Sequence, residues 1–309
     1  MLGELKQLIK GWLGQIQKQR REQELRQSQP HVSSAQIAAD LRRLGVQPGD
    51  ILFIHSSLKS LGFVDGGPKA VIEGMLAAVG PEGTLLLPTY YMPGGSILGA
   101  CKQEGYVFDP RVLGTSMGAL PEAFLQFPGV CRSIHPTHSV SAIGKHAQYL
   151  TDAHHLAPSI FGVGSPWQRF HELKGKVLGI GITLGPVTFY HLLEDTLGDA
   201  FPVVIWGEET YRIPCKGWQG EDYQVPVRPF RADIAPVRID HKTRDDLRDF
   251  MWQHMSAAGA LHQGKVGNAQ SWYIAADEFF DQIKLLAERG ITVYTPREEL
   301  ADKAGGQSA

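Results

Sequence analysis

The sequence predicts an α/β fold with a mixed central sheet flanked by helices. Three β-rich runs, ILFIHS at 51–56, TLLLPTYY at 84–91 and VLGIGITL at 177–184, alternate with segments whose apolar residues recur at helical spacing. Proline- and glycine-containing turns at 47–50 and 80–83 separate these segments. Such alternation is typical of a parallel or mixed sheet covered by helices.

The expected helices follow from apolar periodicity and from residues that begin or end helices. A helix is expected after Ser33, another after Pro68, and further ones over 116–127, 185–198, 244–258 and 275–289. Residues 92–115 are rich in glycine and proline and predict a long loop near a site, because long ordered loops are usually functional. Residues 200–240 contain five prolines and predict an exposed subdomain of short strands on the substrate side.

The first thirty residues form a separate extension. They place six apolar residues at helical spacing, followed by a charged run over 18–26, which predicts an amphipathic helix: Leu2, Leu5, Ile9, Trp12, Leu13 and Ile16. The apolar stripe favours packing on the same domain or across a homodimer, and docking on a membrane surface is the alternative. The segment lacks the apolar core of a signal peptide and contains no apolar stretch long enough to span a bilayer.

Composition excludes several classes of protein. The 309 residues carry a formal net charge of -2, so no basic field points to nucleic acid. The cysteines Cys101, Cys131 and Cys215 are odd in number and far apart, which gives neither a disulfide framework nor a zinc ribbon. A cytoplasmic protein is therefore predicted.

A first candidate site lies at the exit of the first predicted strand. His55, Ser56, Ser57, Leu58 and Ser60 follow this strand, and a glycine turn with Lys69 precedes the next helix. Backbone N–H groups at a helix start, with hydroxyls and a lysine nearby, favour a phosphate or pyrophosphate. An ordinary turn with capping serines explains the same residues, and no Walker A or GxGxxG pattern is present.

A second candidate is the pair His191 and Glu194, three residues apart on a predicted helix and therefore on one face. A carboxylate that accepts from one ring nitrogen fixes the tautomer and raises the basicity of the other nitrogen. Such a pair suits a general base that removes a proton from an amine. A simple polar pair that stabilises the helix is the alternative.

Other histidines give weaker signals. His135, His138, His154 and His155 lack an HExxH pattern and a cysteine cluster, so no metal is predicted and the first two are interpreted as lining a site. A metal-dependent hydrolase built on His135, His138 and His154 remains an alternative. No GxSxG motif supports a serine hydrolase.

Three blocks together resemble the aminoglycoside 3-N-acetyltransferase family. They are ILFIHSSLKSLGFVDGGPKAVIEGMLAAVGPEGTLLLPTY, SMGALPEAFLQFPGVCRSIHPTHSVSAIG and FGVGSPWQRFHELKGKVLGIGITLGPVTFYHLLED, and the resemblance covers roughly residues 31–295. It implies the antibiotic N-acetyltransferase fold, distinct from the GNAT fold, over a domain at 31–300. The remaining residues, 301–309, are predicted to be a disordered tail. The resemblance also implies transfer of acetyl from acetyl-CoA, without a metal, to an amino group of a sugar-like substrate, an activity linked to antibiotic resistance.

The resemblance assigns roles residue by residue. His191 and Glu194 match the family's base and its orienting carboxylate, and His55 is a second catalytic candidate that would place the thioester carbonyl. The residues implied to hold CoA are Ser56, Ser57, Leu58, Ser60, Thr89 and Ser116. The residues expected to contact the acceptor are Tyr90, His135, Thr137, His138 and Asp195.

One departure concerns the acceptor. The substrate-side stretch mixes several arginines and a lysine with its acids, whereas polycationic aminoglycosides favour an acidic rim. A nucleotide-linked or phosphorylated amino sugar, or a small amine of surface-polysaccharide or secondary metabolism, is therefore an alternative acceptor. A decayed, non-enzymatic binding protein is a further alternative, which the retained His55, His191 and Glu194 disfavour.

Overall fold

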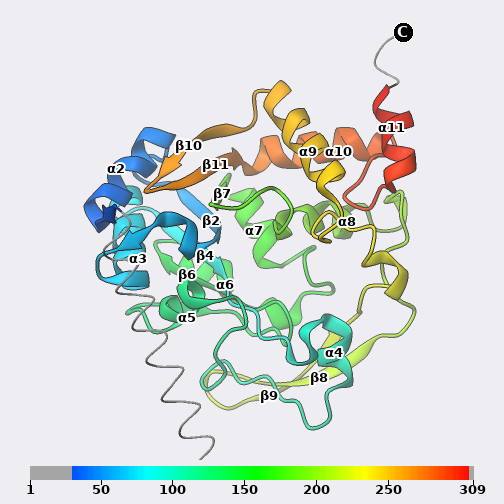
Figure 1. Ribbon diagram of the computed structural model, residues 1–309. Coiled ribbons are helices and arrows are strands. Elements are labelled where there is room, and N and C mark those ends of the chain that lie inside the picture. Colours follow the sequence, from blue (N-terminus) through cyan, green and yellow to red (C-terminus); the bar gives the residue numbers. More distant parts are fainter. Residues whose placement is uncertain (1–29, 306–309) are drawn as a thin grey trace, which may run out of the picture.

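A seven-stranded mixed sheet forms the centre of the molecule in the computed structural model, which describes residues 30–305 (Figure 1). The strand order is β10-β11-β7-β2-β4-β6-β5. The strand β2 pairs in parallel with both β4 and β7, and the remaining pairs are antiparallel. The strands are β2 (Ile51–Ser56), β4 (Thr84–Pro88), β5 (Cys131–Arg132), β6 (Val140–Gly144), β7 (Lys176–Ile180), β10 (His262–Val266) and β11 (Ala269–Ala275). This architecture confirms the predicted α/β class and its three β-rich runs.

Helices cover both faces of the sheet. One face packs against α2 (Ser34–Leu44), α3 (Gly67–Val79) and α5 (Ala119–Leu125). The other face packs against α6 (Ala147–Thr151), α7 (Pro166–Glu172), α8 (His191–Leu197), α9 (Asp245–Ala257) and α10 (Ala276–Glu288). Alternation along each strand sends side chains to opposite faces: Leu52 and Ile54 join the first core, whereas Ile51 and Phe53 join the second.

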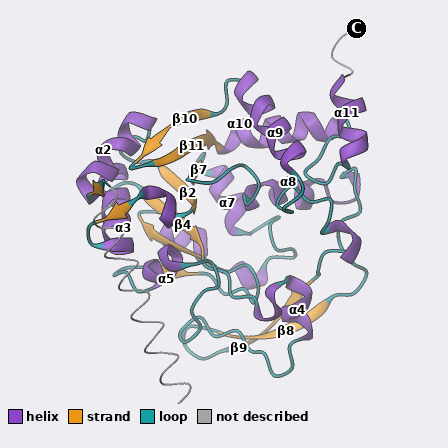
Figure 2. Cartoon of the chain, viewed as in Figure 1, coloured by secondary structure: helices purple, strands orange, loops and turns teal. Residues whose placement is uncertain are grey.

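Short elements complete the fold. The strands β8 (Tyr211–Lys216) and β9 (Asp222–Val227) form an antiparallel hairpin outside the central sheet, within the predicted 200–240 segment (Figure 2). The strands β1 (His31–Val32) and β3 (Phe63–Val64) form a small parallel pair. The single-turn 3-10 helices are η1 (Leu58–Leu61), η2 (Pro93–Gly95), η3 (His154–Leu156), η4 (Thr188–Tyr190), η5 (Gly198–Ala200) and η6 (Ala232–Ile234).

Three sequence-based boundaries are wrong. The predicted loop at 92–115 contains η2 and a helix, α4 (Ile97–Lys102), whose start is capped by Ser96 Oγ accepting from Gly99 N–H at 2.9 Å. The strand predicted to reach residue 184 ends at Ile180, since Gly181 follows with a φ of 65°. The helix predicted over 185–198 begins as η4 and becomes α-helical only at His191.

The disordered tail predicted from residue 301 is also wrong for residues 301–305, which belong to α11 (Arg297–Gly305). Leu300 is buried, and Lys303 Nζ donates to Gly290 O at 2.9 Å, so the helix is attached to the domain. The amphipathic helix predicted over 1–30 falls on residues that, apart from residue 30, lie outside the described part. Within residues 30–305 no helix is long and apolar enough to cross a membrane.

Candidate active site

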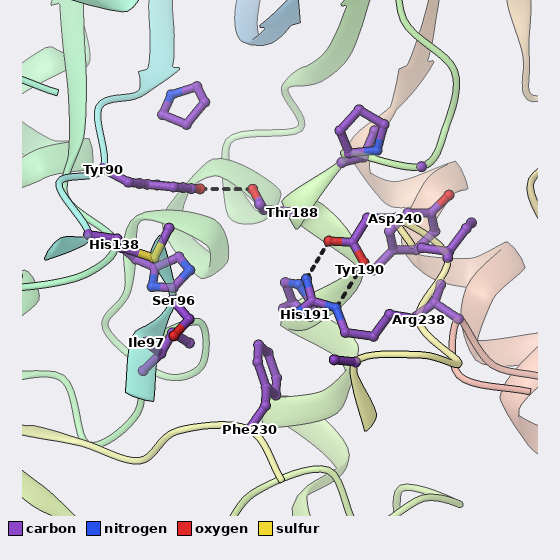
Figure 3. Close-up of a pocket in the computed structure, with 18 of the residues that line it drawn as sticks. Tyr90, Ser96, Ile97, His138, Thr188, Tyr190, His191, Phe230, Arg238 and Asp240 are labelled. Carbon is purple, nitrogen blue, oxygen red and sulfur yellow. Dashed lines mark hydrogen bonds and ion pairs between the residues drawn. The ribbon is translucent and has the colours of Figure 1, made fainter. Parts of the chain in front are cut away.

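A cavity of about 480 Å³ lies beyond the ends of the parallel strands β2 and β4 (Figure 3). His55 at the end of β2 and Tyr90 just after β4 form one side of it. The other sides come from residues 92–98, 185–191, 230–240 and 293–294. A crevice outside the carboxyl ends of parallel strands is where open α/β sheets bind their ligands.

His191 and Glu194 form a hydrogen-bonded pair at this cavity. His191 Nδ1 lies 2.8 Å from Glu194 Oε2, and the two side chains are 9% and 1% exposed. Both lie in the first turn of α8, where a spacing of three residues brings side chains onto one face. With Glu194 ionised, Nδ1–H donates to the carboxylate and the Nε2 lone pair remains free to take a proton.

Glu194 has a second partner that sequence reasoning missed. The Tyr294 hydroxyl donates to Glu194 Oε1 at 2.7 Å, and it comes from the loop after α10, 100 positions along the chain. Both carboxylate oxygens of this buried side chain are therefore hydrogen-bonded. Burial, followed by the Glu194 charge, raises the pKa of Tyr294, so the phenol stays a donor.

His55 lines the same cavity in a neutral state. Its side chain is buried against Phe53, with ring centroids 4.9 Å apart, and burial lowers the pKa of His55 to about 3. Its Nε2 has no hydrogen-bond partner among residues 30–305.

The serines after β2 do not line this cavity. Ser57 N–H donates to Ile180 O at 2.8 Å, and the Ser60 hydroxyl lies 3.1 Å from Ser57 Oγ and 3.3 Å from Gly181 O. Ser56 and Leu58 are half-buried beside them. The expectation that these four residues hold CoA stays a prediction.

Thr89 and Ser116 do not line the cavity either. Thr89 is fully buried, and its hydroxyl donates to Ser139 O at 3.1 Å and pairs with Ser141 Oγ at 2.8 Å. Ser116 N–H donates to Tyr90 O at 2.7 Å. These contacts hold the segment around Tyr90, and the CoA-binding roles of both residues stay predictions.

Tyr90 and His138 contact the cavity directly, with ring centroids 4.6 Å apart. The Tyr90 hydroxyl is hydrogen-bonded to Thr188 Oγ1 at 3.0 Å (Figure 3). Burial, and then the neighbouring His191, His154 and Arg238, lower the pKa of His138 well below its usual value, so its ring is neutral.

His135 and Thr137 form a buried layer behind His138. His135 Nδ1 accepts from the backbone N–H groups of His138 at 3.0 Å and Thr137 at 3.3 Å, and its ring stacks on His154 at 4.4 Å. Neither residue lines the cavity. Within residues 30–305 no three His, Cys, Asp or Glu side chains gather as a metal site would require.

Asp195 lines a second cavity, also of about 480 Å³, together with Asp199, Trp206 and Arg228. Its carboxylate accepts from Phe161 N–H at 2.8 Å, and burial raises the pKa of Asp195. Glu194 borders this second cavity, whereas its partner His191 borders the first. The substrate-binding role of Asp195 stays a prediction.

Sequence reasoning placed residues 200–240 on the substrate side and noted Arg231 and Arg238, which line the first cavity, only as positive charges of that stretch. Arg238 donates to Asp240 through two hydrogen bonds of 3.0 and 2.7 Å, as Figure 3 shows, and its guanidinium carbon lies 4.9 Å from the centroid of the Phe230 ring. The alternation of acids and arginines in this stretch was the only available signal. It did not reveal that the charges are paired.

Comparison with known proteins supports the resemblance. The family model for aminoglycoside 3-N-acetyltransferase matches residues 53–287. An aminoglycoside N(3)-acetyltransferase III from Salmonella sp is 37% identical over 280 residues, covering 87% of this chain and 96% of the relative. A type VII enzyme from Streptomyces paromomycinus is 33% identical over 291 residues, covering 86% and 97%.

Solved structures agree with this relationship. Aminoglycoside acetyltransferase AAC(3)-Xa superposes with a TM-score of 0.72 at 31% identity, covering 87% of this chain and 98% of that one. AAC-IIIb, solved as a binary complex with CoASH, gives a TM-score of 0.71 at 25% identity and coverages of 86% and 100%. The extent of these matches confirms that the chain is an acyltransferase enzyme belonging to the aminoglycoside 3-N-acetyltransferase family.

Proposed function

We propose that this chain transfers an acetyl group from acetyl-CoA to an amino group of an aminoglycoside or related amino sugar bound in the first cavity. The observation that carries the proposal is the buried His191–Glu194 pair, with Nδ1 and Oε2 2.8 Å apart and the imidazole at the cavity wall. An amine cannot attack a thioester while it is protonated, and this pair supplies a base for that proton.

The reaction balances without a covalent enzyme intermediate. The amine nitrogen attacks the thioester carbonyl carbon while His191 Nε2 takes a proton from that nitrogen. The C–S bond then breaks, and the imidazolium returns the proton to the departing CoA sulfur. Glu194 stabilises the transient imidazolium and keeps Nδ1 protonated.

His55 is proposed to place the thioester carbonyl. It lines the cavity at the end of β2, and its low pKa keeps the ring neutral, so the side chain interacts through one N–H donor and one acceptor rather than as a cation. Tyr90 and His138 are proposed to contact the acceptor from the same side of the cavity.

The comparisons support both substrates of the proposal. A neighbour at 25% identity was solved with CoASH, and AAC-VIa, at 28% identity and a TM-score of 0.67, was solved bound to sisomicin. Arg231 and Arg238 in the cavity wall would favour the alternative phosphorylated or nucleotide-linked amino sugar. Arg231 is paired with Asp233 and Arg238 with Asp240. Because these carboxylates balance the positive charge that a phosphate would need, the pairing favours the aminoglycoside.

The test measures CoA release with kanamycin-class and gentamicin-class aminoglycosides and with nucleotide-linked amino sugars. We expect turnover with an aminoglycoside and a fall of about 10²–10⁴-fold in kcat for His191→Ala. His262→Ala, an exposed histidine in β10, is the matched control. Binding of acetyl-CoA without turnover of any aminoglycoside would refute the acceptor assignment, and full activity of His191→Ala would refute the base.

A further inference from the structure

Tyr294 lies at the cavity wall after α10, beyond the residues matched by the family model. The residue is 2% exposed, and its hydroxyl is 2.7 Å from Glu194 Oε1 and 3.5 Å from His191 Nδ1. The longer contact is too distant for a good hydrogen bond, so the hydroxyl donates to Glu194.

The turn that carries Tyr294 is fixed independently of Glu194. Thr292 N–H donates to Thr295 Oγ1 at 2.7 Å, and Ile239 N–H donates to Val293 O at 2.9 Å. The Arg244 guanidinium donates to Thr295 O at 2.6 Å, which attaches the turn to the start of α9. The position of the Tyr294 phenol is therefore set by the turn and does not depend on the His191–Glu194 pair in α8.

The two oxygens of Glu194 are divided between two donors. Oε2 faces His191 Nδ1 and Oε1 faces the Tyr294 hydroxyl, so rotation of the carboxylate would break both contacts. We propose that Tyr294 is a positioning residue, which aims Glu194 at His191 and lowers the proton affinity of the His191–Glu194 pair. This inference rests on the proposed function of His191 as the base.

The direction of the effect follows from the hydrogen bond. A donor to an ionised carboxylate stabilises its charged form and draws charge away from Oε2, so the pair binds a proton less tightly. Removing the donor should raise the apparent pKa of the pair, which titrates as a unit. The other titratable or charged groups around the pair and Tyr294 are His138, Asp195, Arg238 and Asp240, and all four stay in place in the test.

The test is Tyr294→Phe, which keeps the buried ring and removes only the hydroxyl. We expect the acidic limb of kcat/KM against pH to move up by about half to one pH unit and kcat to fall about five- to thirtyfold, with KM little changed. The titration of His191, followed by NMR in the protein without substrate, should move in the same direction.

Tyr190→Phe is the matched control, because Tyr190 is another buried tyrosine at the same cavity whose hydroxyl has no partner among residues 30–305. It should leave the His191 titration in place, whatever its effect on rate. An unchanged titration and pH profile in folded Tyr294→Phe would overturn the positioning role, as would equal shifts in both variants. Full activity of His191→Ala would instead refute the base assignment, while the NMR titration would still report on Tyr294.

Discussion

The two faces of the central sheet bury different chemistry. The core beneath α2, α3 and α5 is made of aliphatic side chains with a few aromatic rings. The core on the opposite face surrounds five buried histidines: His55, His135, His138, His154 and His191. Four of these rings contact Phe53, Phe161 or Trp167, and the His135 ring stacks on His154. One strand serves both, since Leu52 and Ile54 face the first core while Phe53 faces the second.

This difference between the two faces indicates that one face mainly supplies stability and the other carries the chemistry. Apolar burial stabilises by about 25 cal/mol per Å² without directional requirements, so the first face can act as a rigid support. Buried polar groups need partners and cost stability when a partner is lost, so they persist where the site uses them. Substitutions on the two faces should therefore have separable effects on unfolding and on turnover.

The largest expected effect compares two buried carboxylates on opposite faces. Glu194→Gln removes the charge that stabilises an imidazolium on His191, so kcat should fall about 10²–10⁴-fold. The free energy of unfolding should change much less than the activation free energy. Asp40 in α2, which accepts from Gly267 N–H at 2.9 Å and Gln36 Nε2 at 2.7 Å, provides the control. Asp40→Asn should reduce stability and leave kcat of the folded enzyme unchanged; steady-state kinetics and urea unfolding measure both. A large loss of kcat in Asp40→Asn would contradict the separation.

The next effect lies in the apolar face. Leu41 in α2 is fully buried, and Leu41→Ala should lower the free energy of unfolding by about 2–5 kcal/mol through lost burial and a residual cavity. Activity per folded molecule should stay at the original level. Leu285→Ala, at a residue 46% exposed in α10, should change stability by no more than about 0.5 kcal/mol. Urea denaturation followed by circular dichroism checks both, and equal losses would show that Leu41 is not a core residue.

Local patterns explain what the sequence could predict. The strands with His55 and Tyr90 at their ends, and the His191–Glu194 contact, follow from periodicity and from a three-residue spacing within one helical turn. These features depend on residues that are close in sequence. The fold class could be predicted for that reason, and the structure confirms it. The catalytic roles stay predictions.

Contacts between residues far apart in the chain explain what the sequence could not predict. Tyr294 reaches Glu194 from 100 positions away, and no local spacing marks it. The serines after His55 share a strand exit with the cavity, but they contact Ile180 and Gly181 instead, because β2 pairs with β7 at this point. The two hydrogen bonds between Arg238 and Asp240 depend on side-chain geometry that composition does not encode.

The histidine-rich face should also respond to acid. Burial lowers the pKa of His154 to about 3, whereas in the unfolded chain it is about 6.5. The unfolded state therefore binds a proton that the folded state refuses between these values, so the stability contribution is full above about pH 6.5 and declines as the pH falls. His154→Gln should flatten the loss of unfolding free energy between about pH 6.5 and 4.

The control for this acid response is His262→Gln in β10, where the ring is exposed in the folded chain. Urea unfolding at a series of pH values measures both variants. An unchanged slope in His154→Gln would mean that other groups govern the acid sensitivity of this face.

The smallest expected effect compares two helix caps on the two faces. Ser33 Oγ accepts from Gln36 N–H at 3.1 Å and begins α2, so Ser33→Ala should cost about 1 kcal/mol of stability and leave kcat unchanged. Ser165 caps α7 and also donates to Phe161 O at 2.7 Å, and the Phe161 ring lies 4.7 Å from the His191 ring.

Ser165→Ala should cost more stability than Ser33→Ala, because it also removes the donor to Phe161 O, and it should lower kcat about twofold by loosening the ring beside the base. Thermal unfolding and CoA-release kinetics on both variants give the comparison. Both substitutions remove a serine hydroxyl that caps a helix start, so a fall in kcat for Ser165→Ala alone would come from its added contact with Phe161 beside the base. An equal fall in kcat for Ser33→Ala would mean that the apolar face transmits small changes to the site, and that the two faces are not separable.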